Sequence, residues 1–186
     1  GGNVWLDAEK TTPYTFYQFW LNSTDEDAKK YIKIFTFLDK ETIEKLIVEH
    51  DEAPHLRVLQ KRLAEEMMIL VHSKEELERA IFSSDAFFSK DMTELTNMNE
   101  SDLLNIFKSI QMVEIPRSDI EEGLDMIAAL AAKTNFLASN SDARRELKQN
   151  SISLNKEKVG EDKIITKEDL INNQFLLLQK GKKNYY

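Results

Sequence analysis

The apolar residues in the first half of the chain recur every three or four positions, and this spacing constrains the fold more than any other feature. It places them on one face of a helix, and that face must be buried against a neighbour. Four stretches show it, with apolar residues Ala28, Tyr31, Ile32 and Phe35; Ile43, Leu46 and Ile47; Leu56, Leu59, Leu63, Met67, Leu70 and Val71; and Leu77, Ala80, Ile81 and Phe88. The pattern predicts four amphipathic helices with short joints, which make a bundle.

Capping signals stand where these helices are expected to begin and end. Ser23 and Ser73 each open a capping box with Glu three residues later, and Asp39 is a third expected N-cap. Pro54 disfavours helix in the residue before it, so the second helix is expected to end there. The polar stretch 89–99 is expected to be a loop.

The last third of the chain changes character. Ser118 is expected to cap a helix that runs through Ala131, and Asn140 or Ser141 a second, short helix. Short apolar runs then indicate strands at 152–155 and 163–165, on either side of a segment that contains Gly160, and at 175–178, before a turn that contains Gly181. The fold class predicted is therefore mainly α with a small α+β module.

Charge is distributed unevenly along the chain. The formal net charge of −8, taken whole, argues against a nucleic-acid binder, because phosphate contacts need Lys and Arg. From Pro116 onward, however, 12 Lys and Arg stand against 11 Asp and Glu, whereas the first 115 residues hold 13 against 22. The densest basic cluster, with no acid between its members in the sequence, is formed by Lys180, Lys182 and Lys183.

Several classes of site are excluded by what the sequence lacks. Without Cys there are no disulfides, thiolate nucleophiles or Cys-bound zinc, and a cytoplasmic location is expected. His50, His55 and His72 include no i, i+4 pair, so no metal site is expected. No GxSxG, P-loop or GxGxxG motif appears, and no catalytic residue is expected. No apolar run approaches the roughly 20 residues that span a bilayer, and no secretory signal is recognisable.

Three stretches together resemble the bacterial tyrosyl-tRNA synthetase family. The first comprises Gly1-Gly2-Asn3-Val4-Trp5-Leu6-Asp7, Lys10-Thr11-Thr12-Pro13-Tyr14 and Phe16-Tyr17-Gln18-Phe19-Trp20, which in the family follow the KMSKS-type ATP-binding loop. The second comprises Phe35-Thr36-Phe37-Leu38, Leu63-Ala64-Glu65-Glu66 and Val71-His72. The third comprises Arg144-Arg145-Glu146, Gln149-Asn150 and Lys180-Gly181-Lys182-Lys183-Asn184-Tyr185-Tyr186, and it resembles RNA-binding domains of the ribosomal S-four type.

The resemblance implies a domain order. Residues 1–21 are expected to be the tail of a class I catalytic domain, 22–115 a helical anticodon-binding domain with its connection, and 116–186 an S-four type domain with a truncated last strand. The parent enzyme is expected to attach tyrosine to tRNA(Tyr) with ATP and Mg, as a homodimer formed through its N-terminal catalytic domain. This chain lacks the HIGH and KMSKS motifs, so we expect it to bind tRNA(Tyr) as an inactive monomer that holds no cofactor.

Two sets of side chains are candidates for RNA contact. Asp25, with Asp27 as its rival, stands where the family's acidic residue reads the first anticodon base, although an ordinary helix-capping acid explains the sequence equally well. The candidates for the RNA backbone are Arg144, Arg145 and Lys148 in a short helix and Lys180, Lys182 and Lys183 in a turn. The alternative for these cations is a solvated surface, paired in the helix with Asp142 or Glu146.

Two other functions stay open at this stage. A stand-alone module that binds structured RNA fits the S-four type ending, although the aromatic first segment argues against it. A protein-interaction helical bundle fits the acidic first 115 residues and would show no salt-dependent RNA binding.

Overall fold

The computed structural model describes residues 4–181 and 184–186. Its contacts divide the chain into two compact units, Gly1–Asp85 and Ala86–Tyr186. Residues 86–115 therefore group with the C-terminal unit, whereas the sequence placed them with the helical domain. The functional domains 22–115 and 116–186 stay a prediction.

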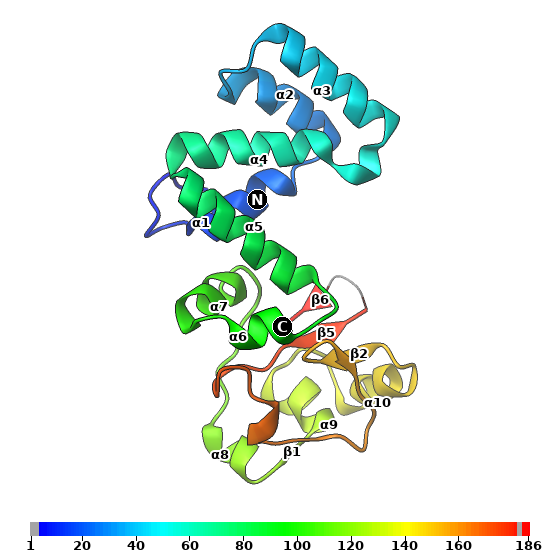
Figure 1. The fold of residues 1–186 in the computed structure, drawn as a ribbon. Helices are drawn as coiled ribbons and strands as arrows, with labels where there is room; N and C mark the ends of the chain where they lie inside the picture. The colour runs from blue at the N-terminus through cyan, green and yellow to red at the C-terminus, as the bar shows by residue number, and fades with distance from the viewer. Residues whose placement is uncertain (1–3, 182–183) are drawn as a thin grey trace. The chain divides into compact units, whose positions relative to one another are not determined.

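The aromatic first segment forms a helix, α1 (Pro13–Leu21), which the sequence pattern did not predict (Figure 1). Thr12 is its N-cap, and its Oγ1 accepts a hydrogen bond from the Thr15 amide at 3.2 Å. The buried residues of α1 are Tyr14, Phe16, Tyr17 and Trp20. Because they do not fall on a single narrow stripe, the helical period is hidden in the sequence.

The first predicted bundle helix is α2 (Asp25–Phe35), but its cap lies one residue later than expected. Thr24 Oγ1 accepts from the amide of Asp27 at 3.1 Å. The hydroxyl of Ser23 instead donates to the carbonyl oxygen of Trp20 at 2.8 Å, at the end of α1. The predicted Ser23 capping box was therefore wrong, because that hydroxyl is used by the preceding helix.

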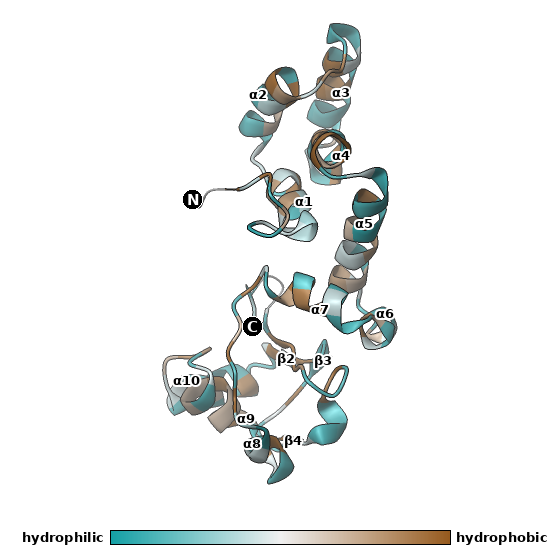
Figure 2. Ribbon diagram, turned by 90° about the vertical axis from the view of Figure 1, so that its left-hand side faces the viewer, coloured by the Kyte–Doolittle hydropathy of each residue, from teal (hydrophilic) through white to brown (hydrophobic). Residues whose placement is uncertain are grey.

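The next two helices follow the sequence closely. Asp39 caps α3 (Lys40–Glu52) through the Thr42 amide, and α3 ends before Pro54 as expected. A 3-10 turn, η1 (Pro54–Leu56), leads to α4 (Val58–Val71). Each of α1, α2 and α3 packs against α4, whose apolar residues appear brown in Figure 2. The buried residues of α4 are Leu59, Gln60, Leu63, Ala64, Met67 and Met68.

Helix α5 (Lys74–Phe88) begins at the predicted Ser73 cap. The Ser73 hydroxyl oxygen accepts from the Glu76 amide at 3.1 Å. In the N-terminal unit, Gln18 Nε2 of α1 donates to the buried Ser84 Oγ of α5 at 2.9 Å. This hydrogen bond satisfies a polar group that the helix buries.

The polar stretch 89–99 is not simply the loop that the sequence indicated. It contains α6 (Thr93–Asn97), whose Leu95 is fully buried. Asn99 then caps α7 (Glu100–Phe107) by accepting from the Asp102 amide at 2.9 Å. One buried leucine among polar neighbours was too weak a signal to predict α6.

The helix expected from Ser118 to Ala131 is interrupted. It is divided into α8 (Arg117–Glu121), β1 (Leu124–Asp125), α9 (Met126–Ala128) and the π-helical turn η2 (Ala129–Lys133). Gly123 has φ of 87°, a conformation that breaks a helix and suits Gly. Leu124 and Asp125 pair antiparallel with β4 (Ile164–Ile165), so a long-range contact decides the break. Ser118 is not a cap, because α8 begins after Pro116.

A short helix and a four-stranded antiparallel sheet complete the C-terminal unit. Helix α10 (Asn140–Lys148) is capped by Ser139, one residue before Asn140 and two before Ser141, the two expected caps. The strands lie in the order β3-β2-β5-β6, with bounds β2 (Ile152–Leu154), β3 (Glu157–Lys158), β5 (Leu178–Lys180) and β6 (Asn184–Tyr185).

The predicted strands at 152–155 and 163–165 do not pair with each other. A tight turn at Asn155 and Lys156, both with positive φ, joins β2 to β3, whereas Ile164 and Ile165 pair with β1. The apolar run 175–178 contributes only its last residue to β5. A 3-10 turn, η3 (Lys167–Asp169), follows β4. No helix within the described ranges, 4–181 and 184–186, combines the length and apolar character needed to cross a membrane.

The core of the C-terminal unit is formed where α10, η2 and the sheet meet. Its most buried members include Met126, Leu130, Ala143 and Ile152, each with no measurable exposure. Leu147 of α10 belongs to the same cluster. Burial of this face turns the opposite, charged face of α10 toward solvent.

Candidate nucleic-acid interface

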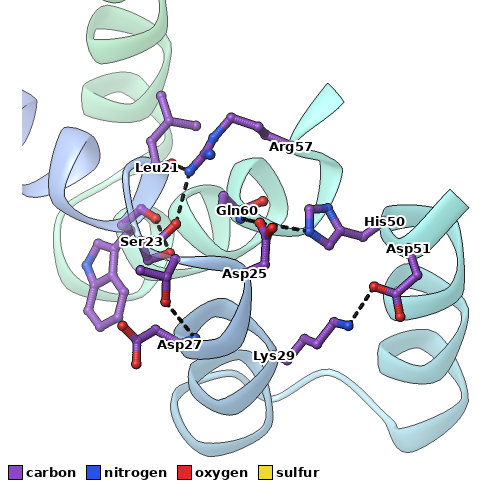
Figure 3. A network of polar contacts seen from close by, with 11 residues as sticks. Leu21, Ser23, Asp25, Asp27, Lys29, His50, Asp51, Arg57 and Gln60 are labelled. Carbon is purple, nitrogen blue, oxygen red and sulfur yellow. Dashed lines mark hydrogen bonds and ion pairs between the residues drawn. The ribbon is translucent and has the colours of Figure 1, made fainter. Parts of the chain in front are cut away.

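The carboxylate of Asp25 is held by two side chains from distant parts of the sequence (Figure 3). Its Oδ1 accepts from Gln60 Nε2 of α4 at 2.6 Å and lies 3.0 Å from His50 Nε2 of α3. A carboxylate only accepts, so the His50 nitrogen that faces it carries a proton. No donor within the described part of the chain reaches Oδ2, and the side chain is 55% exposed. One oxygen is thus anchored while the carboxylate stays accessible.

Arg57 fixes the backbone that leads into Asp25. Its Nη2 donates to the carbonyl oxygens of Leu21 and Ser23 at 2.8 and 3.0 Å. Arg57 itself has φ of 54°, in the left-handed region, just before α4 begins. The turn from α1 to α2 is therefore tied to the start of α4 (Figure 3).

These contacts favour the ionised form of Asp25. The hydrogen bond from Gln60 is the largest cause that lowers the pKa of Asp25, and the hydrogen bond and charge of His50 lower that pKa further. Both neighbours favour the ionised form because they donate to it. A charged acceptor is therefore present at neutral pH.

Asp27 is not brought to the same place. Its amide donates to Thr24 Oγ1, and its half-buried carboxylate has no hydrogen-bond partner among the residues that the structure describes. Two residues along an α-helix correspond to a turn of about 200°, so Asp25 and Asp27 face different directions. Of the two acidic candidates, the structure places Asp25, and not its rival Asp27, beside Gln60 and His50.

His50 and Gln60 are the residues that the sequence did not single out for this site. The sequence pattern indicates no metal site at His50, and no motif marks Gln60. They lie 25 and 35 residues after Asp25, and no local pattern links the three. In the described ranges no group of three or more His, Asp, Glu or Cys side chains is placed to hold a metal ion.

The cations of α10 fall into two kinds. Arg144 and Lys148 are one helical turn apart, both exposed, and neither has an ion pair with any described residue. Arg145 instead pairs with Asp142 at 2.7 Å and lies 3.7 Å from Glu146. The structure therefore leaves two of the three predicted helix cations available for a ligand.

Lys180 does have an acid beside it, contrary to the expectation from sequence. Its Nζ lies 3.0 Å from Glu146 Oε1, and Glu146 also accepts from Ser151 Oγ at 2.7 Å. The Gly181 amide donates to the carbonyl oxygen of Ser151, which brings the end of β5 beside α10. Lys182 and Lys183, the other two predicted turn cations, lie outside the described residues.

Glu146 is an anion surrounded by donors. It is 8% exposed, and the Ser151 hydroxyl, followed by Lys180 and Arg145, lowers the pKa of its carboxyl group. A carboxylate this buried is stable only when it is paired. Its charge offsets those of Arg145 and Lys180, so these cations are weaker candidates for phosphate contact than Arg144 and Lys148.

Two family profiles match this chain. The profile described as tRNA synthetases class I (W and Y) matches residues 1–89, and the profile described as Tyrosine–tRNA ligase SYY-like C-terminal domain matches residues 102–186. The two matches lie on either side of the connection at 90–101.

Curated relatives match along the whole chain. Tyrosine–tRNA ligases from Flavobacterium johnsoniae and Flavobacterium psychrophilum are 59% and 56% identical over 187 aligned residues, which cover 100% of this chain and 43% of each relative. The chain thus spans less than half the length of these relatives. A solved mitochondrial tyrosyl-tRNA synthetase from Aspergillus nidulans, C-terminally truncated, aligns with 33% identity and a TM-score of 0.43, covering 45% of this chain and 25% of that one.

Proposed function

We propose, because this chain belongs to the tyrosyl-tRNA synthetase family, that it is the portion of a tyrosine–tRNA ligase that binds tRNA(Tyr). The observation that carries the proposal is the 59% identity to a curated relative over the full length of the chain. The accessible Asp25 carboxylate and the exposed Arg144 and Lys148 supply groups suited to bases and phosphates. In this proposal the two units contact different parts of one tRNA.

Asp25 is assigned to the first anticodon base. A guanine presents two N–H donors on its Watson–Crick edge, and a carboxylate accepts from such donors. Asp25 is preferred over Asp27 because it is more exposed and its orientation is set by two hydrogen bonds. Asp25 is not the N-cap of α2, because Thr24 occupies that position and its side chain accepts the capping hydrogen bond.

Arg144 and Lys148 are assigned to the RNA backbone. They are exposed on the face of α10 opposite its buried Ala143 and Leu147. Unpaired cations release counterions when they meet phosphates, which makes binding depend on salt. The proposed site also includes the other four predicted cations as additional positive charge: Arg145, Lys180, Lys182 and Lys183. We assign the module from residue 116 onward to the S-four type, because α10 and the basic β5–β6 segment carry its proposed contacts.

The activity of the whole protein is part of the same proposal. With a catalytic domain that carries the HIGH and KMSKS motifs, it would attach tyrosine to tRNA(Tyr) in the cytoplasm, using ATP and Mg, as a homodimer formed through that domain. The present chain contains neither motif, so alone it is proposed to bind tRNA as a monomer without catalysis.

Filter binding tests the proposal. The chain is titrated with tRNA(Tyr) and with an unrelated tRNA at 50 and 200 mM salt, conditions over which phosphate contacts lose much of their affinity. We expect tighter binding of tRNA(Tyr) and a negative salt slope. Arg144→Ala with Lys148→Ala should reduce that slope by about 1.4 to 1.8 for two phosphates lost. Arg117→Ala with Lys133→Ala, which removes the same charge from ion-paired cations, is the matched control.

The outcomes separate the rival functions. Equal affinity for both tRNAs with a salt slope would favour a general structured-RNA module. Absence of salt-dependent binding would favour a protein-interaction bundle. Either result contradicts selective tRNA(Tyr) binding.

A further inference from the structure

Two buried polar side chains direct their observed hydrogen bonds to one oxygen, Oδ1, of the exposed Asp25 side chain. Gln60 has no measurable exposure; its Nε2 donates to Asp25 Oδ1, while its Oε1 is buried without a partner in the described chain. His50 repeats the pattern, because its Nε2 faces Asp25 Oδ1 while its Nδ1 is buried and unpartnered. Each side chain is thus hydrogen-bonded to Asp25 Oδ1, and each has a second buried polar atom without a hydrogen-bond partner in the described chain.

This arrangement is unfavourable for stability alone. Buried polar atoms without partners cost free energy, and an apolar side chain of similar volume avoids that cost. The neighbours of Gln60 on α4, Leu59 and Leu63, are fully buried apolar residues, so a Met or Leu at position 60 would continue the core. The amide is better explained by what it does to Asp25 than by what it contributes to the core.

We infer that His50 and Gln60 are positioning residues that hold the Asp25 carboxylate in one orientation, with Oδ1 anchored and Oδ2 left for the anticodon base. The inference rests on the proposed function, since it presumes that Asp25 reads that base. Two donors from two different helices fix the plane of the carboxylate, whereas one donor would let it turn (Figure 3).

A fixed carboxylate discriminates better than a mobile one. A guanine meets an acceptor that is already oriented, so less side-chain freedom is lost on binding. An adenine presents the lone pair of its N1 at the same edge, and a fixed anion cannot rotate away from that repulsion. If the Asp25 carboxylate can rotate, the preference for guanine over adenine should therefore fall, while the phosphate contacts are unaffected.

The test compares two anticodon stem-loops of tRNA(Tyr), with guanine or adenine as the first anticodon base, against the full chain. The readout is the ratio of the two dissociation constants. For the unaltered chain we expect a ratio of about ten or more, the size of one charge-assisted hydrogen bond gained or lost. Asp25→Asn should bring the ratio close to one, and this variant tests the proposed function itself.

Gln60→Met and His50→Phe then test the inference. Each substitution fills the space of the original side chain with an apolar one and removes its hydrogen bond to Asp25 Oδ1. Each should therefore lower the ratio of the two dissociation constants by about threefold or more. The salt slope should be unchanged, and the unfolding midpoint of Gln60→Met should be equal or higher. If His50 and Gln60 had only a structural role, the variants would bind both stem-loops more weakly with an unchanged ratio of dissociation constants, and their unfolding midpoint would be lower.

Lys29→Met provides the matched control. Lys29 and Asp51 form a 2.5 Å ion pair between the same two helices, α2 and α3, and within the described residues neither side chain forms a hydrogen bond or ion pair with the Asp25 carboxylate. The ratio should stay at its original value. If His50→Phe does not fold, Gln60→Met alone decides.

Two failures are distinguishable. An unchanged ratio in Asp25→Asn would overturn base reading by Asp25, and the inference with it. A lost ratio in Asp25→Asn together with a retained ratio in Gln60→Met would overturn the inference alone.

Discussion

Glu146 and Lys180 form a 3.0 Å ion pair between the last turns of α10 and the end of β5. Glu146 lies 3.7 Å from Arg145 as well, so one nearly buried carboxylate offsets two of the predicted RNA-binding cations. The basic character of this surface is therefore set by pairing as well as by composition.

Removing this carboxylate should strengthen the dependence of RNA binding on salt. In Glu146→Gln the side chain can still accept from Ser151, but Arg145 and Lys180 lose their shared anion. We expect tighter binding of tRNA(Tyr) and a slope steeper by about 0.7 to 0.9 for each phosphate gained, measured by filter binding at several salt concentrations.

Glu157→Gln is the matched control for that experiment. It changes the net charge equally, but the exposed Glu157 of β3 has no ion pair with a described residue. An equal steepening in both variants would show that net charge alone accounts for the effect.

The contribution of Glu146 to stability should disappear in acid. Its pKa in the folded chain lies below the ordinary 4.5, chiefly because Ser151 and Lys180 donate to its carboxylate. A depressed pKa stabilises the folded state above the unfolded pKa, and that stabilisation is lost as the pH falls from about 4.5 through the folded pKa. Urea unfolding from pH 7 to pH 3 should show the difference between the original chain and Glu146→Gln shrinking over that range. A constant difference would contradict the assignment.

The cap of α10 should matter for stability. Ser139 Oγ accepts from the Asp142 amide at 3.1 Å, and Ser139→Ala leaves that amide without its partner. We expect a loss of about 1 kcal/mol in the free energy of unfolding, measured by urea denaturation. Ser141→Ala, at an exposed hydroxyl with no hydrogen bond to a described residue, should change it by less than about 0.5 kcal/mol.

The core of the N-terminal unit should depend on α4. Leu63 is fully buried on the helix that α1, α2 and α3 contact, so Leu63→Ala creates a cavity among them. The expected loss is about 2 to 5 kcal/mol in the free energy of unfolding. Leu70→Ala on the same helix removes a side chain that is 51% exposed, and should cost clearly less. Similar losses in the two variants would mean that Leu63 is not a core residue.

The sequence predicted best what depends on neighbours along the chain. Apolar spacing and caps at Asp39 and Ser73 located α3 and α5, because a cap and an amphipathic stripe are interactions within one helix. The prediction failed where a distant partner competed. Leu124 was expected in a helix but pairs with Ile165 in a sheet. The Ser23 hydroxyl was expected to cap α2 but donates to a carbonyl oxygen of α1.

The candidate site divides in the same way. The residue types themselves indicated an acid at the start of α2 and cations on α10, since charge is a property of the sequence. Tertiary structure decided which of them are available: Gln60 and His50 anchor Asp25 and not Asp27, and Glu146 engages Arg145 and Lys180 but leaves Arg144 and Lys148 exposed. A hydrogen bond or ion pair acts over about 3 Å of space whatever the distance along the chain, so only the fold determines which groups meet.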